Sequence, residues 1–320
     1  MPNNATIIKN GSIQTSSLTH GLLNPEQDRK FIQQTFEATN LGPLLRHTMR
    51  TAKTGEIDKI GIASRILRAK TENTDDGYRA NVNTDVIKYA TTAVRLPWEI
   101  TEETLRENIE GEQFEKIVTD LMTAQLGVDL EDLYLNGDES IPKQYNAGTA
   151  EEPNMKDTPD YNFLKINDGF IKQLKGGSHV VDYSSKNGLD LDLFYKMVRA
   201  IPNKYNNGKL RWLMSPHMKQ EWERYLLEKA ISSSGHNEQS VYNNPAAIPA
   251  IEVAAMGDDN LILTDPKNLC VVNTYGTKIR KTMEGKEAIM MDKRFYVIHL
   301  DFDTVIEELD AAAIATGIKF

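Results

Sequence analysis

Residues 114–138 read FEKIVTDLMTAQLGVDLEDLYLNGD, and this stretch decides the fold. Apolar residues recur in it at helical spacing, which predicts one helix over about residues 110–135. At about 1.5 Å per residue that helix is on the order of 38 Å long, which is long for a globular protein. Its predicted buried face comprises Phe114, Ile117, Val118, Leu121 and Leu126.

The helix is expected to stop at Asn136 and Gly137, because both residue types tolerate the left-handed conformation of a helix C-terminus. A calcium loop starting at Asp132 is the alternative, since Asn136 and Gly137 fit its fifth and sixth positions. Tyr134 and Lys143 then occupy positions that need oxygen ligands, so the calcium loop fails. The acidic stretch is therefore interpreted as a structural helix end.

Composition limits the functions that the chain can have. It has 320 residues, a formal net charge of −9 and a pI of about 5.3, which argues against a protein that mainly grips nucleic acid. Its one cysteine, Cys270, excludes a disulfide within the chain and a multi-cysteine zinc site. No signal peptide and no membrane-spanning run is evident, so a soluble protein of a reducing compartment is expected.

No arrangement of residues predicts catalysis, so we expect no enzyme activity, no metal and no cofactor. The stretch GDDN at 257–260 superficially resembles the paired carboxylates with which template-directed polymerases hold two metal ions. A separate strand-borne aspartate and a basic template channel are not evident. A tight turn between two strands is the favoured interpretation, and a metal-dependent nucleotidyl enzyme is kept as an unfavoured alternative.

The N-terminal hundred residues divide into three parts. Residues 1–24 form a polar arm, and a helix follows from Pro25 with Phe31, Ile32 and Phe36 on its buried face. Residues 56–100 are strand-like around a charged, turn-forming centre, which predicts one long hairpin. An isolated hairpin is marginal in water, so it is expected to lie on another subunit.

Mixed charges at the hairpin favour a protein contact over a nucleic-acid groove. The candidate inter-subunit contact residues are Arg65, Arg68, Lys70, Asp75, Asp76, Arg79 and Lys88.

The remaining chain is a mixture of helices and strands, which places the protein in the α+β class. Residues 191–201 form an expected helix, and Ser215 is expected to cap a second one that starts at Pro216. Residues 269–309 are strand-rich.

Five segments in this order resemble the major capsid proteins of tailed bacteriophages, which share the Hong Kong 97-like fold. LPWEITEETLREN at 96–108 looks like the lead into the spine helix of that family, and 114–138 looks like the spine helix itself. NDGFIKQL at 167–174 is similar to the segment that usually follows. LRWLMSPHMKQEW at 210–222 resembles a strand and helix of the axial domain, and RFYVIHLDFDTVIEELDAAAIATGI at 294–318 resembles the final strand of the peripheral domain.

The resemblance implies a division into an N-terminal arm and helix (1–50), an extended hairpin loop (51–101), a peripheral domain (102–188 and 266–320) and an axial domain (189–265). It also implies a homo-oligomer of hexamers and pentamers that forms an icosahedral shell around double-stranded DNA, within a virion assembled in the host cytoplasm. The partners expected on this basis are a separate scaffolding protein, a portal and an optional decoration protein, with no membrane. An encapsulin-like compartment shell is the alternative with the same fold.

Overall fold

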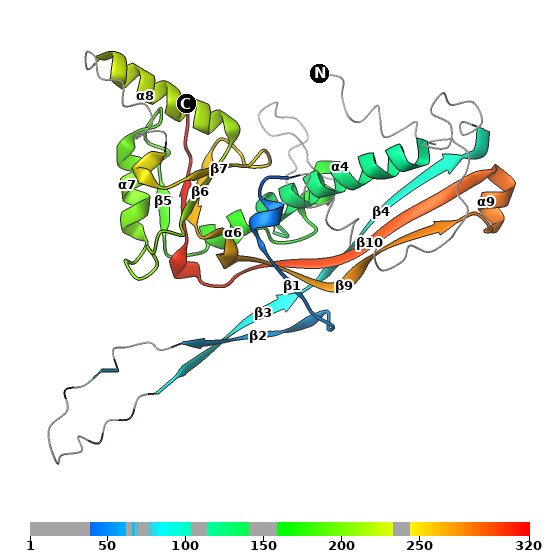
Figure 1. Ribbon diagram of the computed structural model, residues 1–320, viewed down its shortest axis with the longest axis horizontal. Coiled ribbons are helices and arrows are strands. Elements are labelled where there is room, and N and C mark those ends of the chain that lie inside the picture. The colour runs from blue at the N-terminus through cyan, green and yellow to red at the C-terminus, as the bar shows by residue number, and fades with distance from the viewer. Residues whose placement is uncertain are drawn as a thin grey trace, which may run out of the picture.

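The computed structural model describes residues 39–61, 66–67, 69, 77, 79, 81–103, 114–140, 159–232 and 244–320. Two sheets, a projecting hairpin and a long helix organise these residues (Figure 1). The expected arm and helix before residue 39 lie outside the described residues.

The first sheet has four strands in the order β1-β9-β10-β4. Its strands are β1 (Arg46–Met49), β4 (Thr92–Thr101), β9 (Leu269–Thr282) and β10 (Lys293–Ile306). Strand β10 pairs antiparallel with both β4 and β9, whereas β1 lies parallel to β9. Burial along β10 alternates at almost every residue, which is the period-2 pattern of a strand with one face on the core.

Helix α4 (Phe114–Asn136) runs along this sheet and shares one apolar core with it (Figure 1). The helix has the predicted position and ends at the predicted residue. Val118 and Leu126 are buried, and Leu130, Leu133 and Leu135 extend the buried face. Burying aliphatic side chains of this size contributes about 1.5–3 kcal/mol each, so packing on the sheet rather than helix propensity stabilises α4.

The predicted buried face of this helix is partly wrong. Ile117 is 38% exposed and Leu121 is 64% exposed, so neither belongs to the core of the described chain. The near end of α4 carries apolar residues on two sides, and helical spacing alone does not tell which side meets the sheet. The side chain of Phe114 lies outside the described part of the chain.

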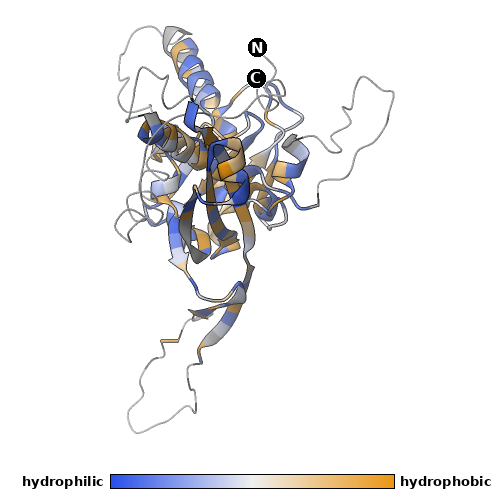
Figure 2. Ribbon diagram, turned by 90° about the vertical axis from the view of Figure 1, so that its right-hand side faces the viewer, coloured by the Kyte–Doolittle hydropathy of each residue, from blue (hydrophilic) through white to orange (hydrophobic). Residues whose placement is uncertain are grey.

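The projecting hairpin consists of β2 (Thr54–Gly61) and β3 (Asn83–Ala90), which form a two-stranded antiparallel sheet of their own. It projects away from the two larger sheets, as two perpendicular views show (Figures 1 and 2). The expected hairpin of residues 51–101 is therefore too long. Its second strand breaks at Thr91, and β4 joins the first sheet instead, pairing with β10 from Thr92 to Thr101. Residues 97–101, in the segment expected to lead into the spine helix, are part of that strand.

The second sheet has five strands in the order β5-β11-β8-β6-β7. Its strands are β5 (Val180–Asp182), β6 (Arg211–Met214), β7 (Ala250–Glu252), β8 (Asn260–Thr264) and β11 (Ala313–Thr316). Helices α7 (Leu191–Ala200) and α8 (Pro216–Ser232) lie with it, and Phe194 packs edge-to-face on Trp212 and Trp222 in its core. Strands β5 and β11 lie outside the range 189–265 that was expected for the axial domain. β5 extends that range at its start, and β11 comes from a separate part of the chain near the C-terminus.

Two short connections side by side join the two sheets. Strand β8 leads into β9 through Asp265–Asn268, and β10 leads into β11 through residues 307–312. Because β8 pairs with β11 and β9 pairs with β10, the same two chain segments are partners in both sheets. Asn268 bridges the connections: its side chain donates to Glu308 O (2.9 Å) and accepts from Glu308 N (2.8 Å).

The remaining helices are short. They are α5 (Pro159–Leu164), α6 (Phe170–Lys175) and α9 (Lys286–Met291), and single 3-10 turns occur at Gly42–Leu44, Pro245–Ala247, Pro266–Asn268 and Leu309–Ala311. Within the described ranges, no helix combines the length and the apolar character needed to cross a bilayer.

Candidate assembly surfaces

The root of the hairpin is tied to the end of β10 by carboxylates. Asp303 accepts a hydrogen bond from Ala90 N (2.7 Å), and Lys53 pairs with Asp301 (3.0 Å). Lys59 forms an ion pair with Glu308, close to where β10 ends. A small apolar cluster of Tyr89, Cys270, Val272 and Val305, with Ile57 and Ile87 against it, lies under these ties. The ties of the described hairpin therefore run from its root at Lys53 and Ala90 along β2 as far as Lys59.

A hollow of about 540 Å³ lies between the hairpin root and the body. It is lined by Gly55 and Tyr89 on the hairpin and by Glu139, Asp168 and Asp303 on the body. Burial raises the pKa of Asp303, hydrogen bonds from Ala90 and Thr304 oppose that rise, and the nearby charges of Glu139 and Asp168 add to it. Burial and the two neighbouring carboxylates therefore disfavour the ionised form of Asp303.

Most of the predicted contact residues cannot be placed. Arg65, Arg68, Lys70, Asp75 and Asp76 lie outside the described residues.

The two predicted contact residues that are described both lie on the exposed hairpin. Arg79 is exposed. Lys88 is exposed on β3, opposite Glu56 of β2, with the charged atoms 4.0 Å apart. Their role between subunits stays a prediction.

A second exposed surface lies at the far end of the β9–β10 ribbon, where α9 connects the two strands (Figure 1). Three apolar side chains are exposed on it: Ile289, Met290 and Met291, with Met290 at 77%. The sequence interpretation missed this helix and took EAIMM for strand. The sequence does hold a signal, because Gly285 stands before the helix and Asp292 follows it, and aspartate tolerates the left-handed conformation. The structure shows Asp292 in that conformation (φ 50°).

The C-terminus of α4 is fixed by close backbone approach. A Cβ added at Gly137 would lie 2.3 Å from Asn167 O and 2.7 Å from Leu133 O, and one added at Gly169 would lie 2.6 Å from Leu135 O. Gly169 N donates to Gly137 O at 2.8 Å. Gly137 is not among the glycines with positive φ, so the expected left-handed stop is the wrong reason for a glycine here. The two glycines are needed because two backbones touch.

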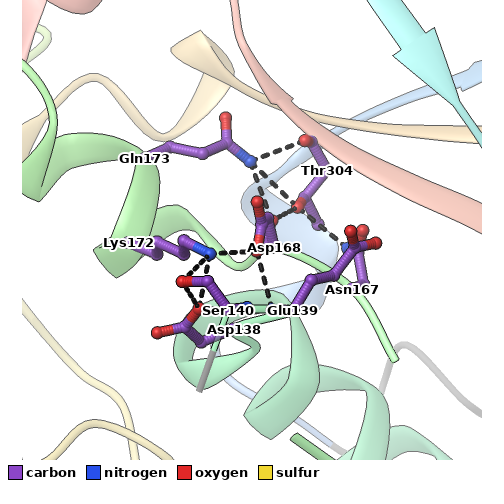
Figure 3. A network of polar contacts seen from close by, with 8 residues as sticks. All are labelled: Asp138, Glu139, Ser140, Asn167, Asp168, Lys172, Gln173 and Thr304. Atoms are coloured by element: carbon purple, nitrogen blue, oxygen red, sulfur yellow. Dashed lines mark hydrogen bonds and ion pairs between the residues drawn. The ribbon is translucent and has the colours of Figure 1, made fainter. Parts of the chain in front are cut away.

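A polar network surrounds this junction (Figure 3). Lys172 of α6 pairs with Asp138 and Asp168, and it donates to Ser140 Oγ (2.7 Å). Burial would raise the pKa of Asp138, but hydrogen bonds from Lys172 and Ser140 hold it below its usual value. Asp138 is thus paired within the chain, which offsets its unfavourable place at a helix C-terminus.

The same network reaches β10 through Thr304. Thr304 Oγ1 donates to Asp168 O (2.6 Å) and accepts from the buried Asn167 Nδ2 (3.1 Å), while Gln173 Nε2 donates to Thr304 O (2.7 Å). In Figure 3 the side chains of Asn167, Gln173 and Thr304 converge on one point between α6 and β10. The end of the long helix is therefore locked to the strand that carries the hairpin root.

A buried charge cluster holds the other end of α4. Arg294 of β10 binds Glu102 (3.0 Å) and Glu115 (3.2 Å), and Lys281 of β9 binds Glu115 (2.8 Å). The side chains of Arg294 and Glu115 are each 6% exposed. Burial lowers the pKa of Lys281, and Glu115 opposes that effect. Such a cluster is costly to break, because the remaining charge is left buried without its partner.

The acidic turn at 257–260 is occupied by structural contacts. Asp258 accepts from Ser215 Oγ and from His217 Nδ1 (3.2 Å), and the Ser215 contact holds its pKa below the usual value. Ser215 Oγ also accepts from Met218 N (3.1 Å), which confirms it as the N-cap of α8. In the described part of the chain, no three His, Cys, Asp or Glu side chains are grouped as a metal site would require.

Comparison with known proteins gives a consistent answer. No family model matches the chain. It is 26% identical, over a 334-residue alignment that covers 99% of both chains, to YqbE of Bacillus subtilis (strain 168), a protein named as a prophage capsid protein.

Solved structures with a similar fold include capsid structures. A chain of the satellite phage P4 procapsid matches with a TM-score of 0.67 at 12% identity, covering 99% of this chain and 96% of that one. The capsid of an empty GTA particle matches with a TM-score of 0.58 at 10% identity and 98% and 97% coverage. A structure from Gordonia phage Cozz gives 0.53 at 13% identity and 96% and 90% coverage. The fold is that of phage capsid proteins, and the resemblance expected from the sequence is confirmed.

Proposed function

We propose that this chain is the major capsid protein of a tailed phage or prophage, which assembles into hexamers and pentamers of an icosahedral shell around double-stranded DNA. The observation that carries the proposal is the whole-length match to a chain of the satellite phage P4 procapsid. The match covers 99% of this chain and 96% of that one, so the likeness is not confined to one motif or domain. A capsid role is structural and needs no catalytic residues.

The parts of the structure fit the Hong Kong 97-like plan. On this proposal the β2–β3 hairpin is the extended loop, α4 is the spine helix, the four-stranded sheet belongs to the peripheral domain and the five-stranded sheet is the axial domain. Among the described residues, β2 and β3 pair only with each other, so a neighbouring subunit would supply the further surface that the hairpin lacks. Each contact is modest, and closure of a symmetric shell multiplies it.

The net charge of −9 suits a container rather than a tight DNA binder. Affinity for DNA comes mainly from neutralised phosphates, so an acidic shell would hold packed DNA weakly and let it slide. A separate scaffolding protein, a portal and an optional decoration protein are the partners that such a shell would use. The virion is the proposed location, after assembly in the host cytoplasm. No specific observation favours an encapsulin-like compartment or a nucleotidyl enzyme.

Electron microscopy of the purified full chain tests the proposal. We expect polyhedral shells, tubes or capsomer rings when the chain is expressed with the proteins of its own phage or prophage. A matched variant replaces residues 62–82 with an Asn-Gly turn, which joins the last paired residues Gly61 and Asn83. That variant should keep the thermal unfolding of the single chain and lose shells. Small monodisperse species from the unmodified chain, even with the phage proteins present, would refute a capsid role.

A further inference from the structure

One side of α4 carries an apolar seam that the described fold leaves uncovered. The α4 seam consists of Ile117, Leu121, Ala124 and Val128, all exposed, with Leu121 at 64% and Val128 at 46%. The opposite side of the helix packs on the first sheet through Val118 and Leu126. The seam is therefore a second apolar face of the same helix.

The spacing of the seam indicates what kind of partner it fits. Its residues follow each other at steps of four, three and four, which is the a/d repeat with which one helix packs against another. The exposed residues beside it are polar: Lys116, Asp120 and Gln125. Apolar seams with polar borders are typical of helix–helix contacts, so the seam fits a second amphipathic helix.

The chain itself enters the described structure at one end of this seam. Leu41 N donates to the buried Glu131 of α4 (3.1 Å), and Asn40 Nδ2 donates to Glu252 O (3.2 Å). A hollow of about 410 Å³ lies there, lined among others by Thr39, Val128 and Glu131. Whatever precedes Thr39 in the chain must therefore start beside Val128.

The preceding sequence has the composition and the length to cover the seam. Pro25 begins a segment in which Phe31, Ile32 and Phe36 fall at helical spacing. At about 1.5 Å per residue a helix over 25–38 would be roughly 20 Å long, against roughly 17 Å for the seam from Ile117 to Val128.

We propose that residues 25–38 dock as a helix on the α4 seam of their own chain, parallel to α4. Because the segment ends beside Val128, equal rise along both helices brings Phe36 to Val128 and Ile32 to Ala124. The docked segment would cover apolar surface that the unassembled chain otherwise presents to water. Docking does not require shell assembly, so this proposal and the proposed function fail separately.

Disulfide trapping tests the register. In a full-length Cys270→Ala background, the pair Ile32→Cys with Ala124→Cys is oxidised at low protein concentration and run on a non-reducing gel. Ala124 is exposed, so the change should not disturb folding. The matched control pairs Ile32→Cys with Leu227→Cys on α8, another exposed helix position. We expect an intramolecular bond that forms at least tenfold faster in the seam pair than in the control. Linked dimers alone would assign the seam to a second copy, and equal rates in the two pairs would mean that the segment does not dock there; either result overturns the proposal.

Limited proteolysis gives a second readout without cysteines. Arg29 and Lys30 are trypsin sites within the segment. Leu121→Glu places a charge in the seam, and we expect it to speed cleavage at these sites at least tenfold. Leu227→Glu alters another exposed leucine, 50% accessible on α8, and should leave cleavage unchanged. Equal cleavage of both variants would overturn the docking.

Discussion

Replacing Gly137 with alanine should destabilise the chain through steric overlap alone. The new Cβ would lie 2.3 Å from Asn167 O. The backbone fixes the position of the Cβ, and Asn167 O is itself a backbone atom, so no side-chain rotation relieves the overlap. Relief requires that the two segments separate, which breaks the bonds Gly169 N to Gly137 O and Asp138 N to Leu164 O, both 2.8 Å. These bonds are worth about 1 kcal/mol each. Residual overpacking adds about 1–3 kcal/mol, so we expect the free energy of unfolding to fall by about 3–5 kcal/mol in all.

Urea denaturation of the unassembled chain measures this loss as a change in the free energy of unfolding. Gly176→Ala is the matched control, because its added Cβ would meet Gln173 O at an ordinary 3.4 Å and its φ is −81°. That change should be neutral or stabilise by up to about 1 kcal/mol through the unfolded state. If Gly137→Ala unfolds within about 0.5 kcal/mol of the unmodified chain, the close-approach explanation of the helix end is refuted.

Three further changes follow from the described contacts. Burial raises the pKa of Asp303, so the folded chain binds more protons than the unfolded chain at pH values between the usual pKa and the raised pKa. The free energy of unfolding therefore falls as pH rises through that window. Asp303→Asn should remove this fall when urea unfolding is measured against pH, and an unchanged pH dependence would contradict the explanation. Arg294→Met should cost about 3–5 kcal/mol in the same assay, because it removes the cation that Glu102 binds and leaves Lys281 as the remaining cation on Glu115. The exposed Lys88→Met should cost under about 1 kcal/mol, and similar losses would argue against a buried cluster. Ser215→Ala should cost about 1 kcal/mol by removing the N-cap of α8, and no loss would mean that another group satisfies Met218 N.

The features that the sequence predicted well are those specified by neighbouring residues. The span of α4 and the cap at Ser215 each depend on a pattern within a few residues. The stop at Asn136 was also predicted, but its cause was not. The close approach of Gly137 to Asn167 joins positions 30 residues apart, and no local pattern encodes such a contact.

The features that were missed depend on distant partners. The strand expected to continue the hairpin changes sheet at Thr91, because β4 finds its partner in β10 about two hundred residues later. Strands β5 and β11 join the second sheet for the same reason, although each has only a few residues. Ile117 and Leu121 were assigned to the core because spacing identifies an apolar face and not what covers it.

The paired connections between the sheets limit how the two halves of the molecule can move. A single strand would act as a swivel and leave three rotations free. Two adjacent strands, cross-linked by Asn268, resist twisting about their length and sliding past each other. One apolar core also spans the two sheets, because Leu213 and Ile314 of the second sheet pack in the same cluster as Phe302 of β10. The two sheets therefore move together, and a force applied to one of them is passed on to the other.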